Sequence, residues 1–211
     1  MYILYISSLK LKIKLKKQIK SQNKSQNSAL LIQVIIIKLD LNQDLKDNVV
    51  GKMIERTLVV LKPDAVQRQI TGEIISRFEK IGLKIVGLKM IWVSKDFAKN
   101  HYKEHLQKPF YGFLEQMITE GPVIAMVLEG IHAVEIVRKI VGPTEPRKAP
   151  AGTIRGDYAM HSAEYADANK KAVRNLIHAS DSKESAEKEI KLWFSEAELF
   201  KYKTVHEQHT F

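Results

Sequence analysis

The sequence contains no cysteine, which excludes disulfide bonds and thiolate chemistry. Long apolar runs are lacking as well, since none approaches the roughly 20 residues that a helix needs to cross a bilayer. Near the N-terminus, no apolar region is followed by a small-residue cleavage site, so a signal peptide is not expected. These absences suit a reducing compartment, and we expect a cytoplasmic location.

The composition is that of an ordinary globular protein. Of the 211 residues, 45% are hydrophobic and 27% are charged. A chain of this length favours one domain plus an appendage over two domains.

The positive charge is concentrated at the N-terminal end. Residues 1–52 contain ten lysines, no arginine and three aspartates, so they account for seven of the ten net positive charges. The lack of arginine argues against a mitochondrial presequence. Within this stretch, "LKLKIKLKKQIK" alternates basic and apolar residues, a pattern suited to a membrane surface or to aggregation as a strand. We expect residues 1–52 to be a poorly ordered extension, or an artefact of gene calling if translation starts at Met53, and residues 53–211 to be the domain.

From residue 54 onward, hydrophobic periodicity predicts a regular order of elements. The predicted strands are 56–61, 83–93, 122–130 and a brief one at 174–177. One predicted helix begins just after Thr71, and the others cover 96–105, 110–118 and 132–142. A last helix is expected to start at Asp181, with Glu184 at the capping-box spacing and an apolar face made of Ala186, Ile190 and Trp193 with Phe194. The order β-α-β-β-α-β predicts an α+β, ferredoxin-like fold, with helices packed on one face of an antiparallel four-stranded sheet.

One histidine stands out at the junction before the last helix. His178 lies in "NLIHASDS", between a short apolar step and a cluster of small polar residues. A neutral imidazole is a competent phosphoryl acceptor near pH 7. A helix start just downstream offers free backbone N–H groups and the positive end of a dipole, which both favour an anionic group. This pattern indicates a nucleophile for phosphoryl transfer.

Five sequence blocks occur in the same order as in nucleoside diphosphate kinases: "ERTLVVLKPDAV", "HYKEHLQKPFYGFLEQM", "GPVIAMVLEG", "GTIRGD" and "NLIHASDS". The chain resembles that family over about residues 54–202. The resemblance implies transfer of the γ-phosphate of ATP or another nucleoside triphosphate to nucleoside diphosphates. It also implies a ping-pong route through a phosphohistidine on His178, a requirement for Mg²⁺, and a homo-oligomer that is usually a hexamer and sometimes a tetramer.

The resemblance also assigns roles to individual residues. Glu189 would orient and polarise the imidazole, as carboxylates do elsewhere. Tyr102 would hydrogen-bond near the histidine, Phe110 would stack on the base, and the remaining predicted nucleotide-binding residues are Lys62, Arg138, Thr144, Arg155 and Asn175. The amide of Asn175 would contact the ribose hydroxyl.

Elementary chemistry supports part of this set, because phosphoryl transfer needs cations that converge on the reacting phosphate. Lys62 ends an apolar strand, Arg138 lies on a predicted helix, and Arg155 is flanked by glycines that would let the backbone approach a ligand. No cluster of carboxylates offers a protein-made metal site, so we expect Mg²⁺ to arrive with the phosphates. Of the other histidines, we expect His105 to line the pocket edge and the rest, His101 included, to lie at the surface.

The sequence departs from the usual family pattern at Ala65, at Ala179 and in the segment 157–175, which is longer than in familiar members. Two rival functions are a nucleic-acid-binding module on a ferredoxin-like sheet and a catalytically dead interaction protein. The strand 83–93 lacks the K/R-G-F/Y signature and exposed aromatics of the first. The second conflicts with the presence of every matched ligand residue. We therefore expect no dedicated nucleic-acid or membrane partner.

Overall fold

The computed structural model describes residues 50–51, 53–205 and 207–210, and the fold below belongs to the unit that begins at Met53. The expectation for residues 1–52 therefore falls almost entirely outside the described residues. Within the described part of the chain, no helix is both long enough and apolar enough to cross a membrane.

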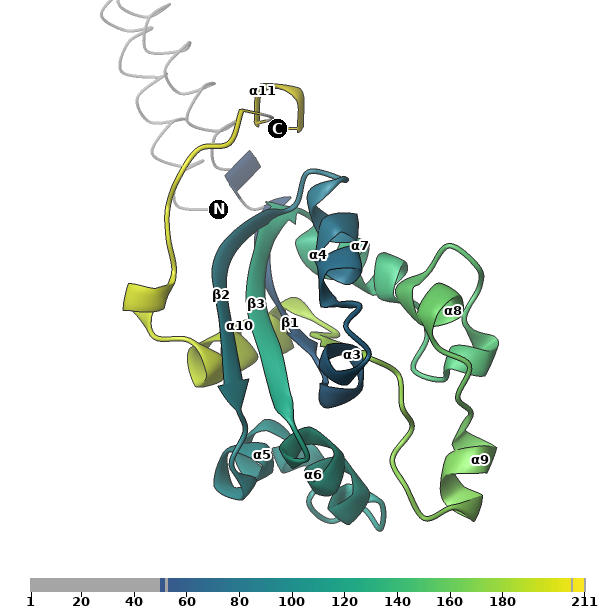
Figure 1. The fold of residues 1–211 in the computed structure, drawn as a ribbon. Coiled ribbons are helices and arrows are strands. Elements are labelled where there is room, and N and C mark those ends of the chain that lie inside the picture. Colours follow the sequence, from purple (N-terminus) through teal and green to yellow (C-terminus); the bar gives the residue numbers. More distant parts are fainter. Residues whose placement is uncertain (1–49, 52, 206, 211) are drawn as a thin grey trace, which may run out of the picture. The chain divides into compact units, whose positions relative to one another are not determined.

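A four-stranded antiparallel sheet organises this unit, with the strand order β2-β3-β1-β4 (Figure 1). The strands are β1 (Ile54–Leu61), β2 (Lys84–Trp92), β3 (Pro122–Ile131) and β4 (Ile177–Ala179). This sheet confirms the predicted ferredoxin-like α+β fold. Strand β4 is short and includes His178, whereas the sequence placed the strand at 174–177, before the histidine.

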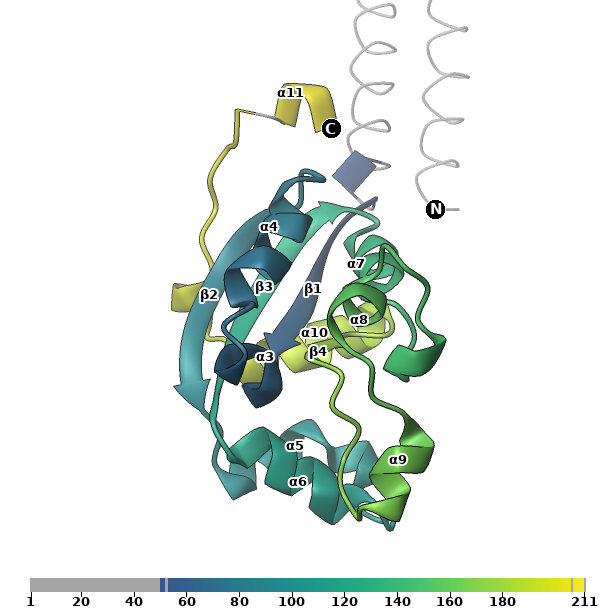
Figure 2. The same ribbon diagram turned by 45° about the vertical axis from the view of Figure 1, so that its right-hand side comes forward.

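Helices cover both faces of the sheet, and not one face as predicted (Figures 1 and 2). Helices α4 (Thr71–Glu79) and α7 (Ala133–Val141) bury Phe78 and Val137 against Val59 and Leu61 of β1. On the other face lie α5 (Lys95–His101), α6 (Tyr111–Thr119) and α10 (Lys183–Trp193). Because successive side chains of a strand point to opposite faces, a strand covered on both sides is apolar throughout, as "LVVL" in β1 is.

Short helices lie in segments where the sequence predicted no regular element. They are α3 (Pro63–Gln67), α8 (Ile154–Tyr158), α9 (Ala163–Ala168) and α11 (Glu207–Thr210), with 3₁₀ turns at Pro146–Lys148 and Glu196–Glu198. Proline is favourable at the first position of a helix, and α3 begins at Pro63. The helix predicted over 96–105 ends at His101 and continues as a 3₁₀ turn.

The start of α10 also differs from the prediction. Its N-cap is Ser182, whose hydroxyl accepts the N–H of Ser185, so the expected capping role of Asp181 is wrong. Ser182 and Asp181 are both good capping residues, and local sequence does not choose between them. The predicted apolar face of this helix is confirmed, since Ala186, Ile190 and Trp193 are buried.

Candidate functional site

The backbone immediately before His178 adopts a strained turn. Leu176 has φ 68°, a left-handed conformation that is rare for a branched side chain. Across it, the N–H of Ile177 donates to the carbonyl of Asn175 at 2.8 Å, and the N–H of Leu176 donates to Oδ2 of Asp64 at 3.0 Å. Strained turns persist where surrounding contacts over-determine them, and they cluster at functional sites.

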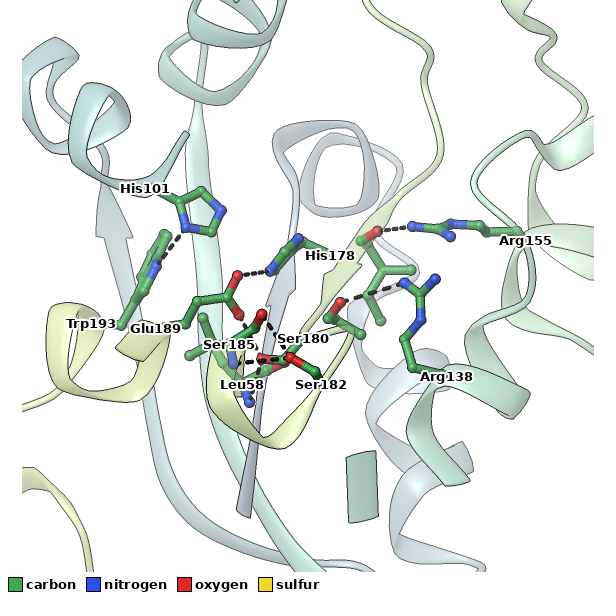
Figure 3. A network of polar contacts seen from close by, with 12 residues as sticks. Leu58, His101, Arg138, Arg155, His178, Ser180, Ser182, Ser185, Glu189 and Trp193 are labelled. Atoms are coloured by element: carbon green, nitrogen blue, oxygen red, sulfur yellow. Dashed lines mark hydrogen bonds and ion pairs between the residues drawn. The ribbon is translucent and has the colours of Figure 1, made fainter. Parts of the chain in front are cut away.

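The imidazole of His178 is held by a carboxylate from α10. Nε2 of His178 lies 2.9 Å from Oε1 of Glu189 (Figure 3). The other carboxylate oxygen accepts the hydroxyl of buried Ser180 at 2.5 Å, which fixes the carboxylate in turn. In a neutral ring this arrangement places the proton on Nε2 and leaves the lone pair on Nδ1. The structure thus brings Glu189 to His178, as the sequence predicted.

Lys62 is a buried cation at the end of β1. Its Nζ donates to Oδ1 of Asn175 at 2.7 Å, and the amide of Asn175 donates to the backbone carbonyl of Thr144 at 2.8 Å. These three predicted residues are therefore joined in one chain of hydrogen bonds. Thr144 takes part through its carbonyl, whereas the prediction concerned its hydroxyl. Burial, and then repulsion from Arg155, lowers the pKa of Lys62 to about 8.

Arg155 is also buried, and its guanidinium donates to three backbone carbonyls. These belong to Gly142 at 2.9 Å, Asn175 at 3.2 Å and Ile177 at 2.6 Å. Burial, and then repulsion from Arg138, lowers the pKa of Arg155 to about 10, so the guanidinium stays charged at pH 7. Three of its five N–H groups thus tie the long segment after α7 to the strand that bears His178.

The glycines around Arg155 have a different use from the one predicted. A Cβ on Gly156 would lie 2.1 Å from the carbonyl oxygen of Pro150. The absence of a side chain there lets the loop close on itself, and the expectation of an approach to a ligand is wrong for Gly156. Gly152 has φ 89°, a conformation that favours glycine, and open space around it.

The two arginines bracket the histidine (Figure 3). Arg155 bonds the carbonyl of Ile177, and Arg138, in the last turn of α7, lies 3.5 Å from the carbonyl of Ala179. Residues on both sides of His178 are thus held by cations. Arg138 lowers the pKa of Arg155, and Arg155 lowers the pKa of Lys62, so the structure gathers positive charge that a polyanion would neutralise.

A row of aromatic rings runs from α5 to the start of α6. The centroid of Tyr102 lies 6.3 Å from that of His105, which lies 5.8 Å from that of Phe110. Phe110 is 44% exposed, so part of its side chain is accessible to a ligand. Tyr102 is buried, its hydroxyl has no hydrogen-bond partner within the described ranges, and burial raises its pKa above the usual range. The phenol is therefore a protonated donor.

His101 is the residue of the site that sequence reasoning missed. It was expected at the surface, but its Nδ1 accepts the indole N–H of buried Trp193 at 3.2 Å, and its Nε2 is buried. Burial, and then repulsion from His178, lowers its pKa well below the ordinary value. Its ring centroid lies 4.8 Å from that of His178 at an interplanar angle of 85°. The available signal in the sequence was that His101 directly precedes Tyr102, which the resemblance had already assigned to the site.

Candidate metal ligands within the described ranges form one group of three or more: His101, His178 and Glu189, whose ligand atoms lie within 4.8 Å of one another. Two nitrogens and one carboxylate do not suit Mg²⁺, which prefers an octahedron of oxygens. The residues that the structure describes thus do not fit a protein-held magnesium ion.

Comparison with known proteins identifies relatives over the same part of the chain. A sequence model of the family described as nucleoside diphosphate kinase matches residues 55–199. A nucleoside diphosphate kinase of Pyrococcus abyssi is 57% identical over 148 residues, which cover 70% of this chain and 89% of that protein. One of Staphylococcus epidermidis is 52% identical over 153 residues, covering 72% of this chain and 96% of the relative.

Solved structures agree with the sequence relatives. A nucleoside diphosphate kinase from Borrelia burgdorferi, described as a transition state mimic with bound vanadate and ADP, superposes with a TM-score of 0.73 at 38% identity. The superposition covers 75% of this chain and 98% of the Borrelia chain. A halophilic nucleoside diphosphate kinase from Halobacterium salinarum, in complex with CDP, superposes with a TM-score of 0.68 at 41% identity. The superposition covers 74% of this chain and 98% of the Halobacterium chain.

Proposed function

Because this chain belongs to the nucleoside diphosphate kinase family, we propose that His178 is the residue through which it transfers phosphoryl groups between nucleotides. The family's activity, transfer of a phosphoryl group from a nucleoside triphosphate to a nucleoside diphosphate, is the activity of this chain. The proposal concerns the route and the residues. The observation that supports it best is the contact of His178 Nε2 with Glu189, which leaves Nδ1 as the nucleophilic nitrogen.

The proposed route has two half-reactions. The lone pair of Nδ1 attacks the γ-phosphorus of the triphosphate, an N–P bond forms, and the bond to the bridging oxygen breaks as the nucleoside diphosphate leaves. An oxygen of the terminal phosphate of a second nucleoside diphosphate then attacks the phosphohistidine, and the N–P bond breaks. A covalent intermediate lets one site serve donor and acceptor in turn.

The surrounding residues supply charge and position. Glu189 stabilises the imidazole as it gains positive character on phosphorylation. Lys62, Arg138 and Arg155 neutralise the phosphates, and the phenol of Tyr102, which is unpaired among the described residues, is a further donor. Phe110, whose side chain is partly exposed, would stack on the base. A single stacking surface reads no hydrogen-bond pattern, so we propose broad base tolerance. Asn175 and Thr144, already linked to Lys62, complete the nucleotide contacts.

We propose that Mg²⁺ enters with the nucleotide, held by phosphate oxygens and water. When bound, it would neutralise phosphate charge. The described residues support this arrangement because their one metal-type cluster is nitrogen-rich and involves the nucleophile itself.

A test of the route is incubation of the protein with γ-labelled ATP and Mg²⁺. We expect label that is labile to acid and stable to alkali, as a phosphoramidate is, and that passes to added GDP. Label on a residue other than His178, or no label, would contradict the proposal.

The same assay on a chain that begins at Met53 tests the proposal that residues 53–211 suffice for activity, and loss of transfer in that shorter chain would overturn it.

The titration of Lys62 predicts a pH dependence of nucleotide binding. With a pKa of about 8 in the free protein, Lys62 loses its positive charge as the pH rises through that value. We therefore expect affinity for the triphosphate to fall on the alkaline side, measured as Kd by calorimetry on both sides of pH 8. In Lys62→Arg this alkaline loss should disappear, since arginine stays charged. An identical pH profile in the two proteins would contradict the assignment.

We further propose a homo-oligomer in the cytoplasm. The sheet-edge strand β2 supports self-association because it exposes Leu88 and Met90, at 51% and 57%. Light scattering on the purified protein measures the mass, and a monomer at working concentration would contradict the oligomer. Fractionation of expressing cells tests the location, which recovery of the protein with membranes would contradict.

A further inference from the structure

His101 lies against the nucleophile but is held from the opposite side. Its Nδ1 accepts a hydrogen bond from Trp193, and its ring meets that of Trp193 edge-on, with centroids 5.2 Å apart at 90° (Figure 3). Trp193 is 2% exposed and contacts Phe97 in a second edge-to-face pair, with centroids 4.8 Å apart. His101 is therefore fixed by a packed tryptophan that is itself fixed.

The hydrogen bond also sets the tautomer of His101. A nitrogen that accepts an N–H carries no proton, so the proton of the ring is on Nε2. That atom is buried and has no hydrogen-bond partner among the residues that the structure describes. Buried polar groups without partners are uncommon, so the position of His101 calls for an explanation.

A metal ion is one explanation of this cluster, since His101, His178 and Glu189 offer three ligand atoms within 4.8 Å. However, a metal on Nε2 would move the ring proton to Nδ1, where it would face the N–H of Trp193. A metal on Nδ1 would displace the tryptophan altogether. Either mode loses the one hydrogen bond that the imidazole of His101 makes within the described part of the chain, so the geometry favours a role without metal.

The contact with His178 suggests that role. The imidazole of His178 is tied at Nε2 by Glu189 and stands edge-to-face with His101, at an interplanar angle of 85°. A rotation of the His178 ring about its bond to the backbone would change both contacts at once. Two restraints of different kind thus define the plane in which Nδ1 lies.

We propose that His101 is a positioning residue for phosphoryl transfer: oriented by Trp193, it holds the plane of the His178 imidazole so that Nδ1 faces the reacting phosphate. The inference rests on the proposed role of His178. Lys62 is proposed to act on the phosphates and Glu189 directly on the His178 imidazole. In contrast, Trp193 would affect His178 only through His101. Small misplacements of a reacting group cost rate rather than affinity.

The test measures the first-order rate constant of phosphoenzyme formation at saturating nucleotide, in a single turnover. Trp193→Phe keeps an aromatic ring but lacks the N–H, and we expect the rate constant to fall on the order of tenfold. The Kd for nucleotide should stay unchanged. A rate constant per active site does not depend on the fraction of folded protein, so a merely structural role would lower the amplitude and leave the rate constant unaltered.

Two further variants sharpen the comparison. Trp92→Phe is the matched control, because the indole of Trp92 donates to the carbonyl of Thr119 at an exposed position. Trp92 ends strand β2 and is 67% exposed, so the expectation that the strand 83–93 exposes no aromatic residue is wrong. His101→Asn, whose carbonyl oxygen can accept the N–H of Trp193, should retain more of the rate than His101→Phe.

Unchanged rate constants in Trp193→Phe and His101→Phe would overturn the inference, as would an equal loss in Trp92→Phe. If the original protein itself formed no phosphoenzyme, the proposed function would fail first. The two failures are therefore distinguishable.

Discussion

His178→Ala is expected to abolish both the phosphoenzyme and nucleotide phosphoryl transfer. No other described side chain combines a free ring nitrogen with a carboxylate at 2.9 Å and flanking carbonyls bonded by two arginines. Loss of a covalent nucleophile removes the route itself. We therefore expect a decrease of at least about four orders of magnitude, the scale seen when a nucleophile is deleted. The measurement is acid-labile label per chain, with transfer to GDP followed in parallel.

The fold should survive this change. The side chain of His178 is 25% exposed, so its removal opens little core volume. The matched control is His209→Ala, on exposed α11, which should label and transfer normally. Ordinary turnover in His178→Ala, with an unaltered melting temperature, would show that another residue accepts the phosphate.

Lys62→Ala is expected to lower transfer by about 10²–10³-fold, or about 2.7–4 kcal/mol of transition-state stabilisation, as for loss of one oriented donor. Lys62 is 7% exposed. Among the described residues its ammonium group makes one hydrogen bond, to Asn175, so two of its three N–H groups remain for phosphate oxygens. In a water-poor site such a cation contributes far more than at the surface. Initial rates of transfer at saturating nucleotide measure the effect.

Lys99→Ala is the control, because the side chain of Lys99 is 55% exposed and its Nζ lies 3.6 Å from a carboxylate oxygen of Asp96. It should change transfer little. Equal losses in the two variants would mean that net charge, and not a site, is being measured. Arg155→Ala is a poorer probe than it looked from sequence, because it removes three hydrogen bonds to backbone carbonyls and should lower stability along with activity.

The sequence by itself determined the elements with a strong period and the chemistry that local motifs encode. The apolar run of β1, the amphipathic α7 and the apolar face of α10 were predictable because burial on one or two faces leaves a direct pattern in the order of residues. The pairing of His178 with Glu189 followed from the resemblance together with a compatible helical spacing. The ferredoxin-like order could likewise be deduced from the sequence of elements.

Tertiary structure decided what depends on partners distant in the chain. Whether Asp181 or Ser182 caps α10 is a choice between two good residues, and the folded chain places the hydroxyl of Ser182 where it accepts the N–H of Ser185. Arg155 donates hydrogen bonds to three backbone carbonyls because the end of α7, its own loop and β4 meet there. These carbonyls lie 13 to 22 residues from Arg155 in the sequence. His101 looked like a surface residue, since nothing near it in sequence reveals Trp193, 92 residues away. Burial and hydrogen-bond partners of single polar side chains are properties of the packed molecule, and for that reason local sequence left them open.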